Sequence, residues 1–195
     1  MTNKALNTLF FRKAVAADAA TIVAIVNSAY RGEASRKGWT TEADYLDGAR
    51  TDLVEINQLI VANGSVILLC QPAGETREHG VPPIVGTLHL SRIEDEGECA
   101  GYFSMFAIDP DLQAGGIGKQ MMQAAEELVQ HEWSAKKMLM DVIPLRRELL
   151  AFYTRRGYQL TGKVKPFPVN PTLWTPKTAA LESALVLARM EKRLA

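Results

Sequence analysis

Hydrophobic residues occur along the chain in two kinds of pattern, and the first of them predicts β-strands. Short apolar runs rich in β-branched and aromatic residues, bounded by glycine, proline or charged residues, are typical of strands. Such runs are expected to form strands over residues 9–15, 65–71, 84–93, 99–108, 138–143, 158–161 and 184–194. Three of these runs follow one another between residues 65 and 108 without a helical segment between them, which favours an antiparallel meander.

The second pattern places apolar residues three and four positions apart and predicts helices. Helices are expected over residues 18–30, 41–60 (with a break near Gly48), 118–134 and 147–155. Asp18 and Thr40 or Thr41 are suitable N-caps for the first two, and Gly157 is a natural residue to end the last. Loops are expected at the polar segment 31–38 and at 163–177, which contains four prolines.

The order of these elements indicates the fold class. The strand–helix–strand unit over residues 99–143 requires a parallel pair of strands, whereas the preceding strands connect as an antiparallel meander. The expected fold is therefore α/β (α+β), with a mixed, mostly antiparallel sheet of about six or seven strands, a central parallel pair, and helices on both faces.

Composition narrows the class of protein. The chain has 195 residues, and its 22 Lys and Arg balance its 22 Asp and Glu. This length predicts one domain, and the charge balance gives no reason to expect nucleic acid or a membrane as partner. Cys70 and Cys99 lie in apolar, strand-like runs and are expected to be buried, reduced thiols. With no signal-peptide pattern and no apolar run of about 18 residues, a cytoplasmic protein is expected.

The stretch from Asp109 to Gln130 places three glycines between a predicted strand and a predicted helix. A helix N-terminus carries backbone N–H groups without intrahelical partners and the positive end of the helix dipole. Glycines before it let an anion approach the backbone without meeting a Cβ atom. The stretch therefore predicts a phosphate or pyrophosphate site.

Two familiar phosphate motifs do not fit this stretch. A P-loop would need glycine at Gln113 and serine or threonine at Gln120. A dinucleotide fingerprint would need a third glycine at Met121. ATP, GTP and NAD are therefore disfavoured as ligands.

The pattern Gln-x-x-Gly-x-Gly at Gln113, Gly116 and Gly118 does match a known family. Together with Phe152-Tyr153 and Gly157-Tyr158, and with the opening segment from Phe11, it resembles the GNAT superfamily of N-acetyltransferases over nearly the whole chain. The resemblance implies one N-acetyltransferase domain over residues 1–195, a GNAT-type sheet whose central parallel pair is splayed by a bulge, and acetyl-CoA as co-substrate.

The resemblance also implies residues that bind acetyl-CoA. The backbone amides that would bind the pyrophosphate are those of Gln113, Ala114, Gly115, Gly116, Ile117, Gly118 and Lys119. Phe106, Ala107 and Ile108 would pair with the pantetheine like an added strand, and the Phe106 amide would polarise the acetyl carbonyl. The Lys119 side chain either contacts a phosphate or is a solvated lysine at the helix start.

The same resemblance implies roles for two side chains. Tyr153 matches the family's tyrosine that protonates the departing CoA sulfur, because a phenol is protonated at neutral pH; the alternative is a tyrosine packed in the core. Arg146 stands where many family members have asparagine. It either reaches a phosphate or carbonyl of the cofactor or is a solvated arginine at the helix start.

The general base remains open at the level of sequence. Glu33, Glu42 and Glu98 are either bases or surface carboxylates, and Tyr102 and Ser104 are placed to position a water molecule. The three histidines lack the spacing of metal ligands, so no metal site is expected.

Two segments are expected to form the acceptor site in a protein of this family. The first combines aromatic with acidic residues, namely Tyr30, Trp39, Tyr45, Glu33, Glu42, Asp44 and Asp47. This combination suits a cationic amine through charge pairing and cation–π contact, although a solvated loop and helix face explain it equally. The second, residues 166–176, is long enough for a lid or a dimer contact anchored by Phe167 and Trp174.

The leading hypothesis is an enzyme that transfers an acetyl group from acetyl-CoA to a primary amine, with a small molecule favoured as the acceptor, by direct attack in a ternary complex. An acetyltransferase of protein N-termini or lysines, and an acyl-CoA-binding regulatory protein without turnover, are the alternatives. Either a monomer or a homodimer is compatible with the sequence.

Overall fold

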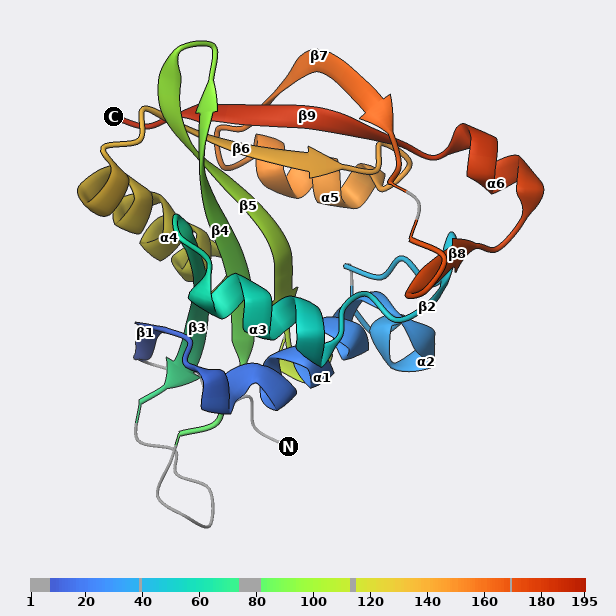
Figure 1. The fold of residues 1–195 in the computed structure, drawn as a ribbon, viewed down its shortest axis with the longest axis horizontal. Coiled ribbons are helices and arrows are strands. Elements are labelled where there is room, and N and C mark those ends of the chain that lie inside the picture. Colours follow the sequence, from blue (N-terminus) through green and yellow to red (C-terminus); the bar gives the residue numbers. More distant parts are fainter. Residues whose placement is uncertain (1–7, 39, 74–81, 113–114, 169) are drawn as a thin grey trace.

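A seven-stranded sheet forms the centre of the protein in a computed structural model, which describes residues 8–38, 40–73, 82–112, 115–168 and 170–195 (Figure 1). In spatial order the strands are β1 (Leu9–Lys13), β3 (Ser65–Pro72), β4 (Gly86–Asp95), β5 (Glu98–Ile108), β6 (Lys137–Val142), β9 (Val186–Arg193) and β7 (Gln159–Pro166). Neighbouring strands are antiparallel except for β5 and β6, which are parallel. The fold class predicted from the sequence is confirmed.

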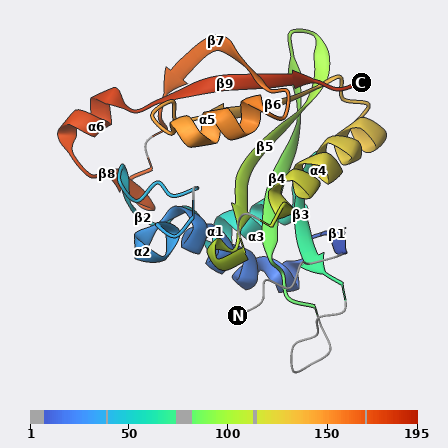
Figure 2. The same cartoon turned by 180° about the vertical axis from the view of Figure 1, so that it is seen from behind.

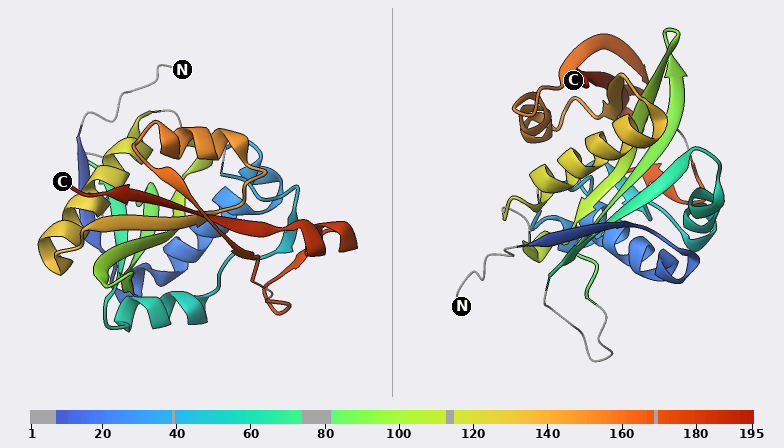
Figure 3. Two further views of the ribbon diagram at one scale, coloured as in Figure 1. Left: turned by 90° about the horizontal axis from the view of Figure 1, so that it is seen from above. Right: turned by 90° about the vertical axis from the view of Figure 1, so that its left-hand side faces the viewer.

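Helices cover both faces of the sheet, as expected. The longer ones are α1 (Ala19–Tyr30), α3 (Leu53–Val61), α4 (Ile117–Trp133) and α5 (Arg147–Thr154). Apolar side chains of α1 and α3 pack against one face of the central strands, and those of α4 and α5 pack against the other. The two faces are seen from opposite sides in Figures 1 and 2, and the layers are seen edge-on in Figure 3.

The parallel pair separates soon after it forms. Only Ala100, Gly101 and Tyr102 of β5 pair with β6, although β5 continues to Ile108. Between the pairs Thr87–Ala107 and His89–Ser104, β5 contains one more residue than β4, and Met105 has a φ of 47°. A left-handed residue that is not glycine is strained and typical of a β-bulge at a functional site. This bulge lies at the point where β5 turns away from β6.

The prediction of a helix over residues 41–60 is wrong for its first half. The chain there forms a turn and the short strand β2 (Leu46–Gly48), which pairs with β8 (Trp174–Pro176). Gly48 has a φ of 94°, and a Cβ atom on it would lie 2.2 Å from the Leu173 carbonyl oxygen, so the close pairing requires glycine. The helix α3 begins only after Asp52, whose carboxylate accepts a hydrogen bond from the Glu55 amide at 2.8 Å.

Two segments predicted as loops contain regular structure. Residues 31–38 include the short helix α2 (Gly32–Ser35), and residues 163–177 include the end of β7 and all of β8. The helix α6 (Ala179–Ala184) follows, and β9 then forms as predicted. The pairing of β2 with β8 brings the two predicted acceptor segments side by side.

The structure can be compared with several local predictions. Gly157 has a φ of 88°, which fits its place at the end of α5. Cys70 is buried, as predicted, whereas Cys99 is only half-buried, and both are free cysteines. In the part of the chain that the structure describes, no helix is both long enough and apolar enough to cross a membrane.

Candidate functional site

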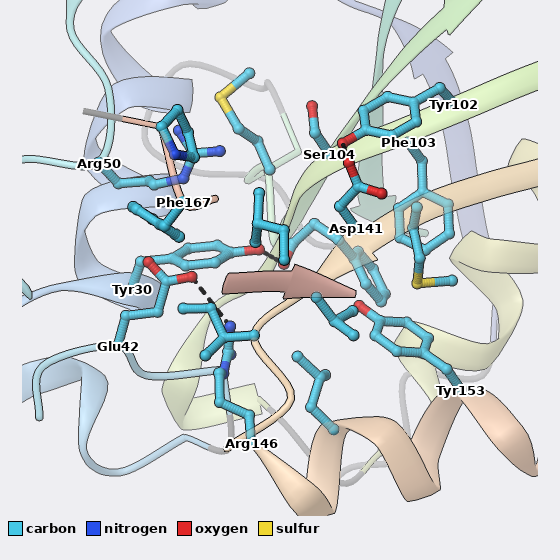
Figure 4. Close-up of a pocket in the computed structure, with 18 of the residues that line it drawn as sticks. Tyr30, Glu42, Arg50, Tyr102, Phe103, Ser104, Asp141, Arg146, Tyr153 and Phe167 are labelled. Atoms are coloured by element: carbon cyan, nitrogen blue, oxygen red, sulfur yellow. Dashed lines mark hydrogen bonds and ion pairs between the residues drawn. The ribbon is translucent and has the colours of Figure 1, made fainter. Parts of the chain in front are cut away.

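A cavity of about 210 Å³ lies where β5 and β6 separate (Figure 4). Phe103 of β5 and Met140 of β6, the first residues beyond the last paired ones, both line it. The remaining walls come from α1, α5, the segment around Glu42 and Arg50, and the segment from Lys165 to Trp174. The cavity is therefore built from parts of the chain that lie far apart in the sequence.

The N-terminus of α4 lies next to the bulged strand. Gly116 precedes the helix with a φ of 79°, and its carbonyl accepts hydrogen bonds from the amides of Lys119 and Gln120. A Cβ atom on Gly118 would lie 3.4 Å from the Phe106 ring, so the helix start packs closely against β5. Gly115 is exposed and Ile117 is buried. The amides of Ile117 and Gly118, at the very start of the helix, have no intrahelical acceptor, which makes this end suitable for an anion.

The structure gives limited information on three of the predicted pyrophosphate-binding positions. Gln113 and Ala114 lie outside the described residues. Lys119 is exposed. The exposure of Lys119 is compatible with both of its predicted roles.

The backbone of Phe106 faces the gap between the strands. The Asp109 amide donates to the Val85 carbonyl on the β4 side at 2.9 Å. Because backbone groups alternate in direction along a strand, the N–H and C=O of Phe106 point away from β4. Its carbonyl accepts a hydrogen bond from the Tyr30 hydroxyl of α1 at 2.9 Å. Ala107, which pairs with Thr87, and Ile108 continue the strand beyond Phe106.

Tyr153 of α5 lies on the floor of the cavity. Its ring is 5.7 Å from the Phe103 ring and 6.1 Å from the Tyr158 ring, between centroids. Figure 4 shows its hydroxyl directed toward the interior of the cavity. Burial raises the pKa of Tyr153 well above its usual value, so the phenol is a proton donor at neutral pH. The ring packs in the core while the hydroxyl is available for chemistry.

Arg146 is not a solvated arginine, and Glu42 is not a surface carboxylate. The Arg146 side chain is 8% exposed and binds Glu42 at 3.1 Å as well as the Thr40 carbonyl. Arg31, also buried, binds the other oxygen of Glu42. One carboxylate therefore holds two guanidinium groups that line the cavity, and Figure 4 shows Arg146 and Glu42 on the same wall.

A second buried carboxylate lies on β6. Asp141 binds Lys165 at 2.6 Å and Arg189 at 2.8 Å, and it accepts a hydrogen bond from the Tyr102 hydroxyl at 3.1 Å. Burial raises the pKa of Asp141, but Arg189 and Lys165 lower it more, so it stays below its usual value. Burial and the adjacent Asp141 raise the pKa of Tyr102. Tyr102 is therefore a protonated phenol rather than a base.

Ser104 lines the cavity and is backed by a buried histidine. The Ser104 hydroxyl lies 2.9 Å from Nδ1 of His89, and the Nε2 atom of His89 lies 3.0 Å from the Ser65 hydroxyl. Burial and the nearby Arg50 lower the pKa of His89 to about 4. The imidazole is therefore neutral at pH 7, and it fixes the hydroxyl of Ser104 at the cavity wall.

The carboxylates that the sequence offered for a cationic amine are already paired. Glu33 and Asp44 both bind Arg36, and Asp47 binds Lys177. Glu98, a candidate base, binds Arg193. These acids and Glu98 do not line the cavity, and Glu42 is neutralised as described above. Trp39 lies outside the described residues.

The outer wall of the cavity carries Arg50. Its guanidinium carbon lies 5.8 Å from the Tyr30 ring centroid and 5.9 Å from that of Trp174. Asn27 of α1 fixes the local backbone, because its side chain accepts from the Arg50 amide at 2.6 Å and donates to the Thr51 carbonyl at 3.0 Å. Figure 4 shows Arg50 across the cavity from Tyr153.

Sequence reasoning missed four charged residues of this cavity, namely Arg31, Arg50, Asp141 and Lys165. None of them belongs to a motif. The one signal in the sequence was Asp141, a single polar residue inside the apolar run of a predicted strand. Phe167 and Trp174, predicted to anchor a lid or a dimer contact, lie on the wall of the cavity and in a small apolar cluster with Leu46, Ile143 and Leu185.

Comparisons with known proteins agree with this architecture. The sequence model of the acetyltransferase (GNAT) family matches residues 24–158. Among curated protein sequences, none is significantly similar to the chain.

Solved structures of other acetyltransferases have a similar fold. A spermidine N-acetyltransferase from Vibrio cholerae, solved with CoA and spermine, superposes with a TM-score of 0.65 at 16% identity, covering 95% of each chain. An N-acetyltransferase from Staphylococcus aureus Mu50 gives a TM-score of 0.64 at 11% identity, covering 96% of this chain and 98% of its own. At these identities the likeness concerns the fold. The family resemblance inferred from Gln113, Gly116 and Gly118 is confirmed.

Proposed function

The chain belongs to the acetyltransferase (GNAT) family, and from this premise we propose that its residues 1–195 form one domain that transfers an acetyl group from acetyl-CoA to a primary amine of a small molecule. The observation that carries this proposal is the separation of β5 from β6. It opens a cavity with the Phe106 backbone on one side and the Tyr153 hydroxyl on its floor. A solved relative of this fold, from Vibrio cholerae, is described with CoA and spermine together.

Acetyl transfer to an amine requires a polarised carbonyl and a stabilised leaving group. The Phe106 N–H faces the gap and is placed to donate to the acetyl oxygen, as an oxyanion-hole donor does. The amine nitrogen attacks the carbonyl carbon, a C–N bond forms, and the C–S bond breaks. Tyr153 gives its proton to the departing sulfur and regains one from solvent. The first-turn amides of α4 bind the pyrophosphate.

The amine must also be neutral when it attacks. Cationic side chains around the cavity favour the neutral form of a bound amine, because like charges lower its pKa. Ser104, held by the neutral His89, orients a water molecule through which the proton of the attacking nitrogen passes to solvent. No separate carboxylate base is then needed, which agrees with the pairing of Glu42 and Asp141 to cations.

Thermal unfolding with and without acetyl-CoA tests the proposed ligand. At about 100 times its dissociation constant, a ligand stabilises the folded state by roughly 2.7 kcal/mol, which raises the melting temperature by several degrees. NADH and ATP serve as controls because their motifs do not fit residues 113–121. The proposal expects a shift with acetyl-CoA alone, and release of free thiol when amines are added. The absence of a shift at millimolar acetyl-CoA contradicts it.

A further inference from the structure

The charges around the cavity are unequal. Four cationic side chains line it, Arg31, Arg50, Arg146 and Lys165, against the two carboxylates of Glu42 and Asp141. Each carboxylate already binds two cations. Glu42 binds Arg31 and Arg146, and Asp141 binds Lys165 and Arg189. The described lining of the cavity is therefore positively charged, and neither carboxylate is available to a cationic ligand.

Several cationic groups of this lining have no partner of their own. Arg50 forms no ion pair or side-chain hydrogen bond with any described residue, and its guanidinium lies beside the rings of Tyr30 and Trp174. Nε and Nη2 of the buried Arg31, and Nε of Arg146, likewise lack a hydrogen-bond partner within the described chain. Buried guanidinium nitrogens without an acceptor are costly. The half-buried Arg50 is the unpaired guanidinium that an oxyanion in the cavity can contact.

The position of Arg50 fits a role in binding a ligand. Asn27 fixes its backbone from α1, and the two rings restrict the side chain by cation–π contact. A guanidinium held in this way offers a planar pair of donors that matches a carboxylate or a phosphate. Tyr153 lies on the opposite side of the same cavity, so a short molecule can reach both.

We propose that the acceptor is a small amine that also carries an oxyanion, either a carboxylate or a phosphate, and that Arg50 binds this oxyanion while the amine points toward Phe106 and Tyr153. The inference rests on the proposed acetyltransferase function and names the chemical class of its acceptor. Polycationic amines are disfavoured, because their second positive charge meets Arg50 and Lys165 rather than a carboxylate.

Matched acceptors test this class directly. Free-thiol release from acetyl-CoA is measured with α-amino acids and their amides, with β-alanine and its amide, with aminoethyl phosphate and ethanolamine, and with spermidine. The expected result is a kcat/KM at least about tenfold higher for an oxyanion-bearing amine than for its neutral partner, the range of a charged hydrogen bond. The carboxylate and phosphate pairs distinguish the two sources of the oxyanion.

Variants assign the preference to Arg50. Arg50→Gln is expected to lower kcat/KM for the preferred acceptor about 10- to 100-fold and to abolish most of the difference between that acceptor and its neutral partner. Arg50→Lys, which keeps the charge but not the planar pair of donors, should retain part of the preference. Arg92→Gln removes an exposed arginine of β4 outside this cavity and serves as the matched control. The melting temperature with acetyl-CoA shows that each variant folds and binds.

The possible results distinguish a failure of the proposed acceptor class from a failure of the proposed acetyltransferase function. Equal or better turnover of the neutral amines or of spermidine overturns the inference and leaves the acetyltransferase intact. An oxyanion preference that survives Arg50→Gln overturns the role of Arg50. If acetyl-CoA binds but no amine of either class is acetylated, the proposed function fails and the inference fails with it.

Discussion

The two ends of the cavity are built in different ways. The end proposed for acetyl-CoA consists of backbone groups and apolar side chains from one continuous stretch, the strand β5 and the start of α4. The end proposed for the acceptor consists of charged and aromatic side chains from α1, the segment around Arg50, β6, β7 and the segment before β8. The end proposed for acetyl-CoA presents backbone hydrogen-bond donors, which do not depend on side-chain identity. The end proposed for the acceptor presents a particular arrangement of charged side chains.

This difference indicates how each end is kept in place. Helix geometry and a bulge position the backbone donors, so their placement depends little on the identity of neighbouring side chains. The charges of the acceptor end hold one another through buried ion pairs, so each depends on its partners. Changes at the first end should therefore alter catalysis or cofactor affinity, and changes at the second should also alter stability.

The largest effect is expected from Tyr153→Phe. Loss of the proton donor to the leaving sulfur should lower kcat by about 100- to 10,000-fold, with little change in KM for acetyl-CoA or in melting temperature, because the hydroxyl bonds to no described residue. Steady-state thiol release measures this. Tyr158→Phe, at a buried tyrosine outside the cavity whose hydroxyl binds Glu126 at 2.9 Å, is the control and should keep its activity. Equal losses in both variants would contradict the assignment.

Glu42→Gln tests the acceptor end. Removing this carboxylate leaves Arg31 and Arg146 without their shared counter-charge in a buried position. The free energy of unfolding should fall by about 3–5 kcal/mol, as measured by urea denaturation. Glu33→Gln removes a carboxylate that is 88% exposed and should change the stability by less than about 0.5 kcal/mol. Similar stability of both variants would mean that the buried pairs do not hold this end together.

A pH titration of stability tests His89, which supports Ser104 at the acceptor end. Its pKa is lowered to about 4 in the folded protein, from about 6.5 in the unfolded chain. The unfolded state therefore takes up the proton first as the pH falls. Stability should be full above pH 6.5 and decline toward pH 4, by about 3 kcal/mol from this group. Melting curves of His89→Gln should lack this part of the decline, and identical pH dependences would argue against it.

The smallest effect is expected from Gly116→Ala at the acetyl-CoA end. Gly116 and Gly162 have φ values of 79° and 82°, and neither would bring a Cβ atom within 4 Å of another group. Alanine at either position should cost about 1–2 kcal/mol of stability from the left-handed backbone. Only Gly116→Ala should also weaken acetyl-CoA binding, as measured by calorimetry. Equal affinities in the two variants would place the pyrophosphate elsewhere.

The end proposed for acetyl-CoA has signals in the sequence that are local. A strand pattern, a cluster of glycines and a helical period are adjacent in the chain, and each has a meaning within about ten residues. The same holds for the Phe152-Tyr153 segment, which the helix α5 carries to the floor of the cavity. The sheet followed from the order of strands and helices, since a strand–helix–strand unit requires a parallel pair.

The acceptor end was decided by the tertiary structure. Residues 41–48 have the periodicity of a helix, but pairing with β8 and the close approach of Leu173 to Gly48 make them a turn and a strand. Arg146 binds Glu42, which is 104 residues away in the sequence. The pairing of β2 with β8 brings Arg50 into contact with the Trp174 ring. The sequence by itself determined most of the elements and predicted the backbone site, because their causes are short-ranged. Charge pairing depends on distances that exist only once the chain has folded.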